Sequence, residues 1–123
     1  MTQSLEDYLE VVSLLSEEGA IRVTDIANRM GVSKPSIITA LKNLEERGMI
    51  IHERYRGVTI TEKGRERAMQ IREKHDFLTS FLRDIVGVPA EIAEDEGCKI
   101  EHIISDNTVK RLKAFLKKVE ACL

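Results

Sequence analysis

The chain has 123 residues, of which 42% are hydrophobic and 33% charged, and its formal net charge is −2. This size and composition exclude a disordered chain, and with only 4% aromatic residues they favour one compact domain or two closely knit modules packed from Leu, Ile and Val. The chain shows neither a basic-then-apolar signal segment nor the roughly 20 apolar residues that span a bilayer, so we expect a cytoplasmic protein without a membrane partner.

The first part of the chain predicts three short helices. Apolar residues recur there at helical spacing, and each stretch opens on Ser or Thr and stops at Gly. The predicted N-caps are Ser4, Thr24 and Ser33. Residues 21–23, between the first two helices, are expected to be extended. The expected helices cover residues 4–18, 24–30 and 34–47.

A β-hairpin is predicted directly after these helices. Residues 49–61 hold two runs with β-branched residues, joined by a short turn with Arg56 and Gly57. Two helices around a tight turn at Gly31, followed by a hairpin, form the order of parts in a winged helix-turn-helix. Residues 20–67 also hold ten basic against six acidic side chains, which suits contact with phosphates.

The helix from Lys34 is expected to enter the major groove of DNA. Its first turns carry polar side chains, while Ile37, Leu41 and Leu44 form its buried stripe. Hydroxyl groups, the Pro ring and the Thr methyl can touch base edges, and basic side chains can hold phosphates. An ordinary small core or a protein-interaction module is the alternative. The predicted DNA-binding residues are Ser33, Lys34, Pro35, Ser36, Thr39, Lys42, Arg54, Arg56 and Lys63.

The remainder of the chain predicts a helical domain. A long helix is capped by Thr61, with Gly64 as a weak spot near its start. A fifth helix is expected to be interrupted or frayed at Gly97, and Ser105 or Asp106 caps the last one. The predicted fold is therefore mainly α, with a winged helix-turn-helix over residues 1–66 and a helical metal-binding and dimerisation domain over 67–123.

Candidate metal ligands lie on three of the predicted helices. Those on the first and the fifth helix are three or four residues apart, so that each set can point from one helical face. Two imidazoles, carboxylates and one thiol suit iron(II), manganese(II), cobalt(II) or zinc(II), and carboxylates can bridge two ions. Taken singly, such residues are more often structural or merely solvated. The candidates are Asp7, Glu10, His75, Cys98, Glu101 and His102.

Motifs along nearly the whole chain resemble the diphtheria toxin repressor and manganese transport regulator family of bacterial and archaeal metalloregulators. The motifs are EDYLE, RVTDIANRMGVSKPSIITALKNLEERGMI, YRGVTITEKG, KHDFLTSFL and EGCKIEHIIS. The resemblance implies a homodimer paired through its C-terminal helices, with the six candidates as ligands. It also implies that bound metal acts as the co-repressor, setting two reading heads at the spacing of a palindromic operator in metal-uptake genes.

The sequence combines features of both branches of this family. Asp7 resembles the manganese branch, where the iron branch has Met, whereas Cys98 resembles the iron branch, where the manganese branch has Glu. At two further positions, where the iron branch has the ligands of an ancillary metal site, this chain has Glu94 and Thr79. The chain also ends before the SH3-like third domain of the longer members, so we expect a two-domain form.

Iron(II) is the favoured metal, manganese(II) the next, and cobalt(II), nickel(II) or zinc(II) are further possibilities in vitro. Two other functions are open on the residues alone. One is a winged-helix regulator or interaction module that needs no metal. The other is an enzyme with a carboxylate-bridged dimetal centre, against which stands the lack of a Gly-rich loop or a nucleophile motif. We therefore expect a repressor and not an enzyme.

Overall fold

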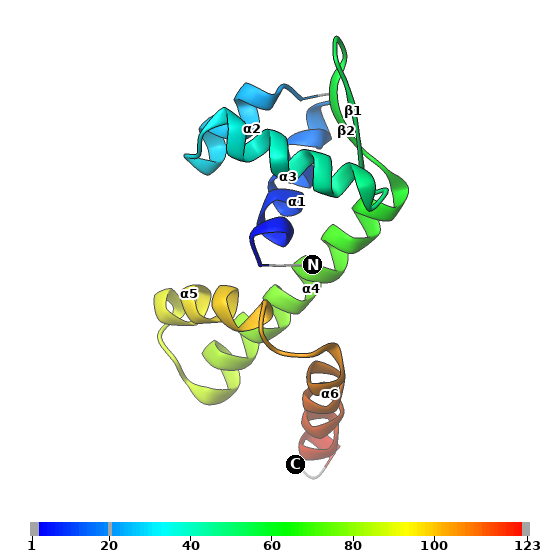
Figure 1. Ribbon diagram of the computed structural model, residues 1–123. Coiled ribbons are helices and arrows are strands. Elements are labelled where there is room, and N and C mark those ends of the chain that lie inside the picture. The colour runs from blue at the N-terminus through cyan, green and yellow to red at the C-terminus, as the bar shows by residue number, and fades with distance from the viewer. Residues whose placement is uncertain (1–2, 20, 122–123) are drawn as a thin grey trace. The chain divides into compact units, whose positions relative to one another are not determined.

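The computed structural model describes residues 3–19 and 21–121, and the chain divides into two compact units, residues 1–72 and 73–123 (Figure 1). Every helix in these described stretches is too short or too polar to cross a membrane. The elements are α1 (Gln3–Leu15), a 3-10 turn η1 (Ser16–Glu18), α2 (Val23–Met30), α3 (Lys34–Glu46), β1 (Ile50–Glu53), β2 (Gly57–Ile60), α4 (Glu62–Ser80), a π-helical segment η2 (Phe81–Val86), α5 (Ala90–Glu101) and α6 (Asp106–Ala121).

The first unit is a winged helix-turn-helix, as the sequence predicts. Helices α1, α2 and α3 pack around an aliphatic core, and the β1–β2 hairpin extends beyond them (Figure 1). The expected stripe of α3 is buried, which anchors this helix and leaves its opposite face exposed. The largest fully buried side chains are those of Leu9, Val12, Ile26, Ile37, Leu41, Leu44, Ile50 and Val58.

The hairpin pairs in antiparallel register, from Ile50 opposite Ile60 to Glu53 opposite Gly57. A single bridge adds Ile21 to its edge, where the backbone groups of Ile21 and Val58 exchange hydrogen bonds of 3.0 and 2.7 Å. Gly57 has a φ of 84°, and a Cβ there would lie 2.5 Å from the carbonyl oxygen of Ile21. Only glycine fits this position, and the wing is thereby held against the helices.

Two of the predicted N-caps in the first unit are wrong. Helix α1 already begins at Gln3, so Ser4 lies inside it, and α2 begins at Val23, ahead of Thr24. Arg22 takes the cap position instead, with its backbone N–H donating to the Asp25 carboxylate at 3.1 Å. The bridge to the wing therefore shortens the expected extended piece at 21–23, because the helix starts as soon as that pairing ends. Ser33 occupies the predicted cap position of α3.

Gly64 is not the weak spot that its helix propensity predicts. A Cβ at this position would lie 2.0 Å from the carbonyl oxygen of Met49 and 2.9 Å from the Ile60 side chain. The missing side chain therefore lets the start of α4 pass against the wing. The predicted cap is confirmed, since the Gly64 N–H donates to the Thr61 hydroxyl at 3.0 Å.

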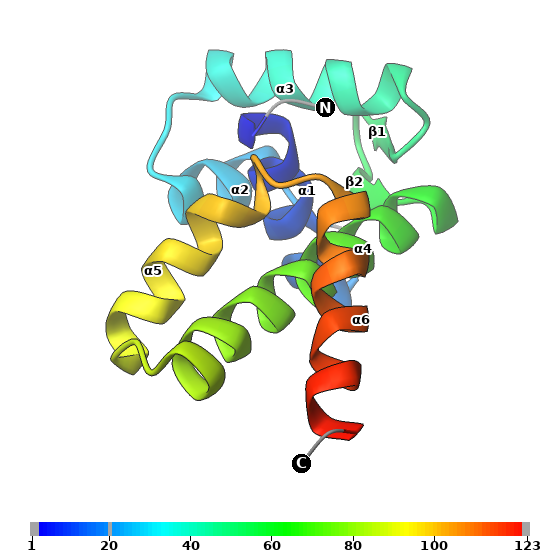
Figure 2. The same cartoon turned by 90° about the horizontal axis from the view of Figure 1, so that it is seen from below.

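The second unit holds the end of α4, the segment η2, and helices α5 and α6. The long predicted helix loses its α-helical form in its last six residues, which are π-helical, and Gly87 in left-handed conformation turns the chain into α5 (Figure 2, yellow). The expected break at Gly97 is wrong, because α5 is continuous and Gly97 is buried within it. The Ser105 hydroxyl accepts from the Thr108 N–H at 3.1 Å, which confirms the cap of α6.

Candidate metal centre and DNA-binding surface

Three of the six predicted ligands converge within the second unit. His75 of α4 and Cys98 and Glu101 of α5 each offer one donor atom, and the three atoms lie within 4.8 Å of one another. The Glu101 side chain is 1% exposed and that of His75 15%, whereas Cys98 is exposed. The cluster is thus buried on one side and open to solvent at its sulfur.

A close approach of α4 and α5 brings these side chains together. A Cβ at Gly97 would lie 2.6 Å from the Thr79 hydroxyl oxygen, so the two backbones nearly touch there. One helical turn away on both helices, Nδ1 of His75 lies 3.0 Å from an oxygen of Glu101. The helices therefore run antiparallel, and the contact between Thr79 and Gly97 sets the separation at which histidine and carboxylate meet.

The Glu101 carboxylate lies between two imidazoles. Its Oε2 is 3.0 Å from Nδ1 of His75, and its Oε1 is 3.2 Å from Nε2 of His102. Glu101 and His102 both have side chains only 1% exposed, although residues of these types are usually found at the surface. A carboxylate is buried at a large cost unless it is paired with charge or metal, which marks this group as a functional candidate.

The chemistry of the donors fits a divalent transition metal. An imidazole nitrogen, a thiol sulfur and a carboxylate oxygen are the groups that bind zinc and related metals at about 2.0–2.3 Å, which places neighbouring ligand atoms roughly 3–3.8 Å apart on one ion. The 4.8 Å limit within which the three donors lie is wider than this spacing. Small side-chain rotations therefore suffice to form a shared site.

Asp7 and Glu10 belong to the first unit, and the other four predicted ligands belong to the second. On α1 the two acids are partly buried, and one oxygen of each lies within 4.8 Å of the other, as their spacing of three residues predicts. Their neighbour Glu6 accepts a hydrogen bond of 2.9 Å from Arg67 of α4. This ion pair fixes the acidic face of α1 within the first unit.

Two side chains beside the centre were not predicted to act there. Nε2 of His75 lies 2.9 Å from a carboxylate oxygen of Glu94, and Lys74 donates to the carbonyl of Ile104 and to the Asp106 carboxylate, the latter at 3.3 Å. Lys74 thereby ties α4 to the turn after α5. Glu94 is four residues before Cys98, a spacing that could have revealed it, whereas nothing in the sequence pairs Lys74 with that turn.

The nine predicted DNA-binding residues are all exposed in the first unit. At the start of α3 the hydroxyls of Ser33 and Ser36 lie 3.0 Å apart, and the Thr39 hydroxyl donates to the Pro35 carbonyl at 3.1 Å. These local hydrogen bonds order the polar first turns, and the hydroxyl oxygens can still accept. The start of α3 thus offers a preformed polar surface.

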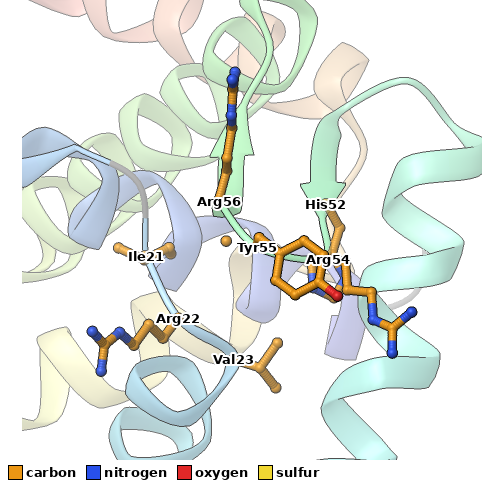
Figure 3. A pocket seen from close by; sticks show the side chains of 8 residues that line it. Ile21, Arg22, Val23, His52, Arg54, Tyr55 and Arg56 are labelled. Carbon is orange, nitrogen blue, oxygen red and sulfur yellow. The ribbon is translucent and has the colours of Figure 1, made fainter.

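A pocket between the turn of the wing and residues 21–23 carries further positive charge. Three arginines line it, Arg22, Arg54 and Arg56, and their side chains point away from one another (Figure 3). The Arg54 guanidinium lies 5.6 Å from the centre of the Tyr55 ring, which is 90% exposed at the wing tip. The arginines therefore spread charge over the wing, and Arg22 extends this basic surface beyond the predicted set.

Both parts of the chain match models of known protein families. Residues 1–58 match the iron dependent repressor, N-terminal DNA binding domain, and residues 61–123 match the iron dependent repressor, metal binding and dimerisation domain. The chain belongs to the diphtheria toxin repressor and manganese transport regulator family. Members of this family are metal-dependent transcriptional repressors and not enzymes.

Relatives within this family align along almost the whole chain. An uncharacterised HTH-type transcriptional regulator of Methanocaldococcus jannaschii is 40% identical over 96% of this chain and 96% of its own length. The HTH-type transcriptional regulator MntR of Bacillus subtilis is 37% identical, over 97% of this chain and 84% of its own.

Solved structures in the family superpose on the chain as well. The manganese regulator SloR has a TM-score of 0.77 at 32% identity and covers 95% of this chain. ScaR, solved with bound Zn²⁺, has a TM-score of 0.82 at 29% identity and covers 92%. A manganese-dependent repressor has been solved with manganese. The chain spans about half the length of these solved proteins, 55% of SloR and 53% of ScaR.

Proposed function

We propose that this chain is a homodimeric repressor that binds a palindromic operator when loaded with iron(II) or manganese(II), and that it controls genes of metal uptake. The observation that carries the proposal is the cluster of His75, Cys98 and Glu101 in the same chain as a winged helix-turn-helix. Iron(II) remains our favoured metal, because the thiol of Cys98 replaces the carboxylate of the manganese branch.

We propose six metal ligands. His75, Cys98 and Glu101 are supported by their short mutual distances, and His102 by its contact with Glu101. Asp7 and Glu10 are included as ligands because their motif resembles that of the family and because they lie close together on α1. Glu101, with one imidazole at each of its oxygens, would supply negative charge and an oxygen ligand to one or two bound ions. The bound metal would supply positive charge that neutralises these carboxylates and holds the helices that carry them. The ligands are Asp7, Glu10, His75, Cys98, Glu101 and His102.

The proposed DNA contacts divide between α3 and the wing. Side chains at the start of α3 would reach base edges in the major groove, and the basic ones further along and in the wing would hold phosphates. Their full exposure supports this role. Arg22 is added to the phosphate contacts because it lines the same basic surface as Arg54 and Arg56. The sequence-predicted contacts are Ser33, Lys34, Pro35, Ser36, Thr39, Lys42, Arg54, Arg56 and Lys63.

The proposed dimer would form through the second unit. Apolar side chains are exposed there on η2, α5, the turn that follows and α6, at 40% to 81% of their surface. Exposed apolar surface of this extent is typical of an interaction site. The side chains are Ile85, Val86, Ile92, Ile103, Phe115 and Val119.

Operator binding measured by gel shift across a titration of iron(II) or manganese(II) tests the proposal. We expect binding to require metal, to be abolished by a chelator, and to need more metal in the Cys98→Ala variant. Asp95→Ala is the matched control, because Asp95 is an exposed acid on the same helix. Operator binding that is unchanged by the chelator would support the alternative of a metal-independent winged-helix regulator or interaction module.

A further inference from the structure

The imidazole of His75 lies between two carboxylates that contact its opposite nitrogens. Nδ1 is 3.0 Å from Glu101, and Nε2 is 2.9 Å from Glu94. The two acids differ in environment, since the Glu101 side chain is 1% exposed and that of Glu94 66%. Nδ1 therefore faces the buried Glu101 carboxylate, and Nε2 faces the exposed carboxylate of Glu94.

A histidine can bind metal only through a nitrogen that carries no proton, so its remaining proton must sit on the other nitrogen. In metal sites that second N–H is commonly held by a carboxylate, which fixes the tautomer and the orientation of the ring. Glu94 stands at the required place for His75. When the ring proton is on Nε2, the Glu94 carboxylate accepts from that N–H, and this leaves an Nδ1 without a proton directed at Glu101.

We propose that Glu94 is a positioning residue that holds His75 with its proton on Nε2 and its Nδ1 turned toward the metal. The inference rests on the proposed metal function. The chain supplies the geometry through α5, on which Glu94, Cys98 and Glu101 are spaced by four and three residues and so share one face. Ala93 and Gly97, both buried, seat this helix.

The alternative is that Glu94 is itself a ligand to an ion at Nε2. The distances favour positioning, because the donors of Cys98 and Glu101 gather with His75 around a single point, and Nδ1 is the ring nitrogen in contact with Glu101. An ion at Nε2 would instead leave the buried Glu101 carboxylate at the opposite ring nitrogen.

Two variants separate these roles. Glu94→Gln keeps an oxygen that accepts from Nε2–H, whereas Glu94→Leu removes it. Glu96→Leu is the matched control, because Glu96 is also an exposed acid of α5. The first measurement is ¹⁵N NMR of the His75 ring in the metal-free protein. We expect the Nε2–H tautomer in the unaltered chain, in Glu94→Gln and in Glu96→Leu. In Glu94→Leu we expect a shift toward the Nδ1–H tautomer, because Glu101 is then the carboxylate left beside the ring.

The second measurement is the affinity for cobalt(II), followed by its visible absorption. We expect Glu94→Leu to bind about 10- to 100-fold more weakly, Glu94→Gln less than about tenfold more weakly, and all variants to keep the thiolate-to-cobalt band and coordination geometry. An unchanged tautomer and affinity in Glu94→Leu would overturn the proposal, and so would a changed cobalt spectrum in both variants. Failure of the unaltered protein to bind cobalt would instead refute the proposed metal function. The tautomer of His75 is measured without metal, so it tests the role of Glu94 independently of that function.

Discussion

Replacing Gly97 by Ala tests whether the close packing of α4 and α5 sets the geometry of the metal centre. The new Cβ would lie 2.6 Å from the Thr79 hydroxyl oxygen, 0.8 Å inside the 3.4 Å at which ordinary contact begins, and 3.2 Å from the Thr79 backbone nitrogen. The hydroxyl can rotate, but relief of the backbone contact requires the helices to separate by a few tenths of an ångström. Overpacking costs about 1–3 kcal/mol, whereas Ala gains about 1 kcal/mol over Gly in a helix.

We therefore expect the free energy of unfolding of the metal-free protein to fall by about 1 kcal/mol, measured by urea denaturation. The separation also moves His75 away from Cys98 and Glu101, and loss of ligand positioning typically lowers metal affinity by about 10- to 100-fold, so affinity for cobalt(II) should fall about tenfold. Thr79→Ala is the control, and the double variant should recover part of both losses because the hydroxyl is removed. Higher stability with unchanged metal affinity in Gly97→Ala would refute this reasoning, since helix propensity alone predicts that result.

Three further substitutions test the packing of each unit by urea denaturation. Gly64→Ala should destabilise the protein by about 1–3 kcal/mol, because its Cβ would lie 2.0 Å from the Met49 carbonyl oxygen, and a stabilised variant would contradict this close approach. Lys74→Met should cost about 1–3 kcal/mol and weaken cobalt binding, because it removes the cation that ties α4 to the turn after α5; unaltered metal affinity would show that this tie does not position the centre. Arg67→Met should cost about 1 kcal/mol through loss of the pair with Glu6, and a cost that salt does not reduce would argue against an ionic origin.

The sequence predicted those parts of the fold that depend on local spacing. The buried stripe of α3 and the cap position of Ser33 follow from helical periodicity, and the caps at Thr61 and Ser105 follow from side chains that accept from a backbone N–H nearby. The predicted cap at Thr24 is wrong because α2 begins at Val23, and the residue that precedes its cap, Ile21, pairs with a strand far along the chain. Val58 pairs with Ile21 and ends the extended piece one residue before α2 begins, which no local pattern reveals.

The candidate metal centre could likewise be predicted only where its residues are neighbours on one helix. Candidate ligands spaced three or four residues apart on one helix, such as Cys98 and Glu101, can be recognised as one face without a structure. The contact of His75 with Glu94 joins two helices, and it depends on how closely those helices approach. That distance is determined by Thr79 and Gly97, a pair that gives no chemical signal of its own.

Both glycines inside predicted helices were interpreted by their propensity, and both proved to mark close contacts. A glycine in a helix costs about 1 kcal/mol, so its presence there implies a compensating gain. At Gly97 the gain is a separation of α4 and α5 short enough for His75 to reach Glu101. An imidazole, a thiol and a carboxylate serve zinc as readily as iron, so selectivity must come from geometry and metal availability. Gly97 would therefore influence the choice of metal through the distance between the helices, and the Gly97→Ala variant tests this by its affinity for cobalt(II).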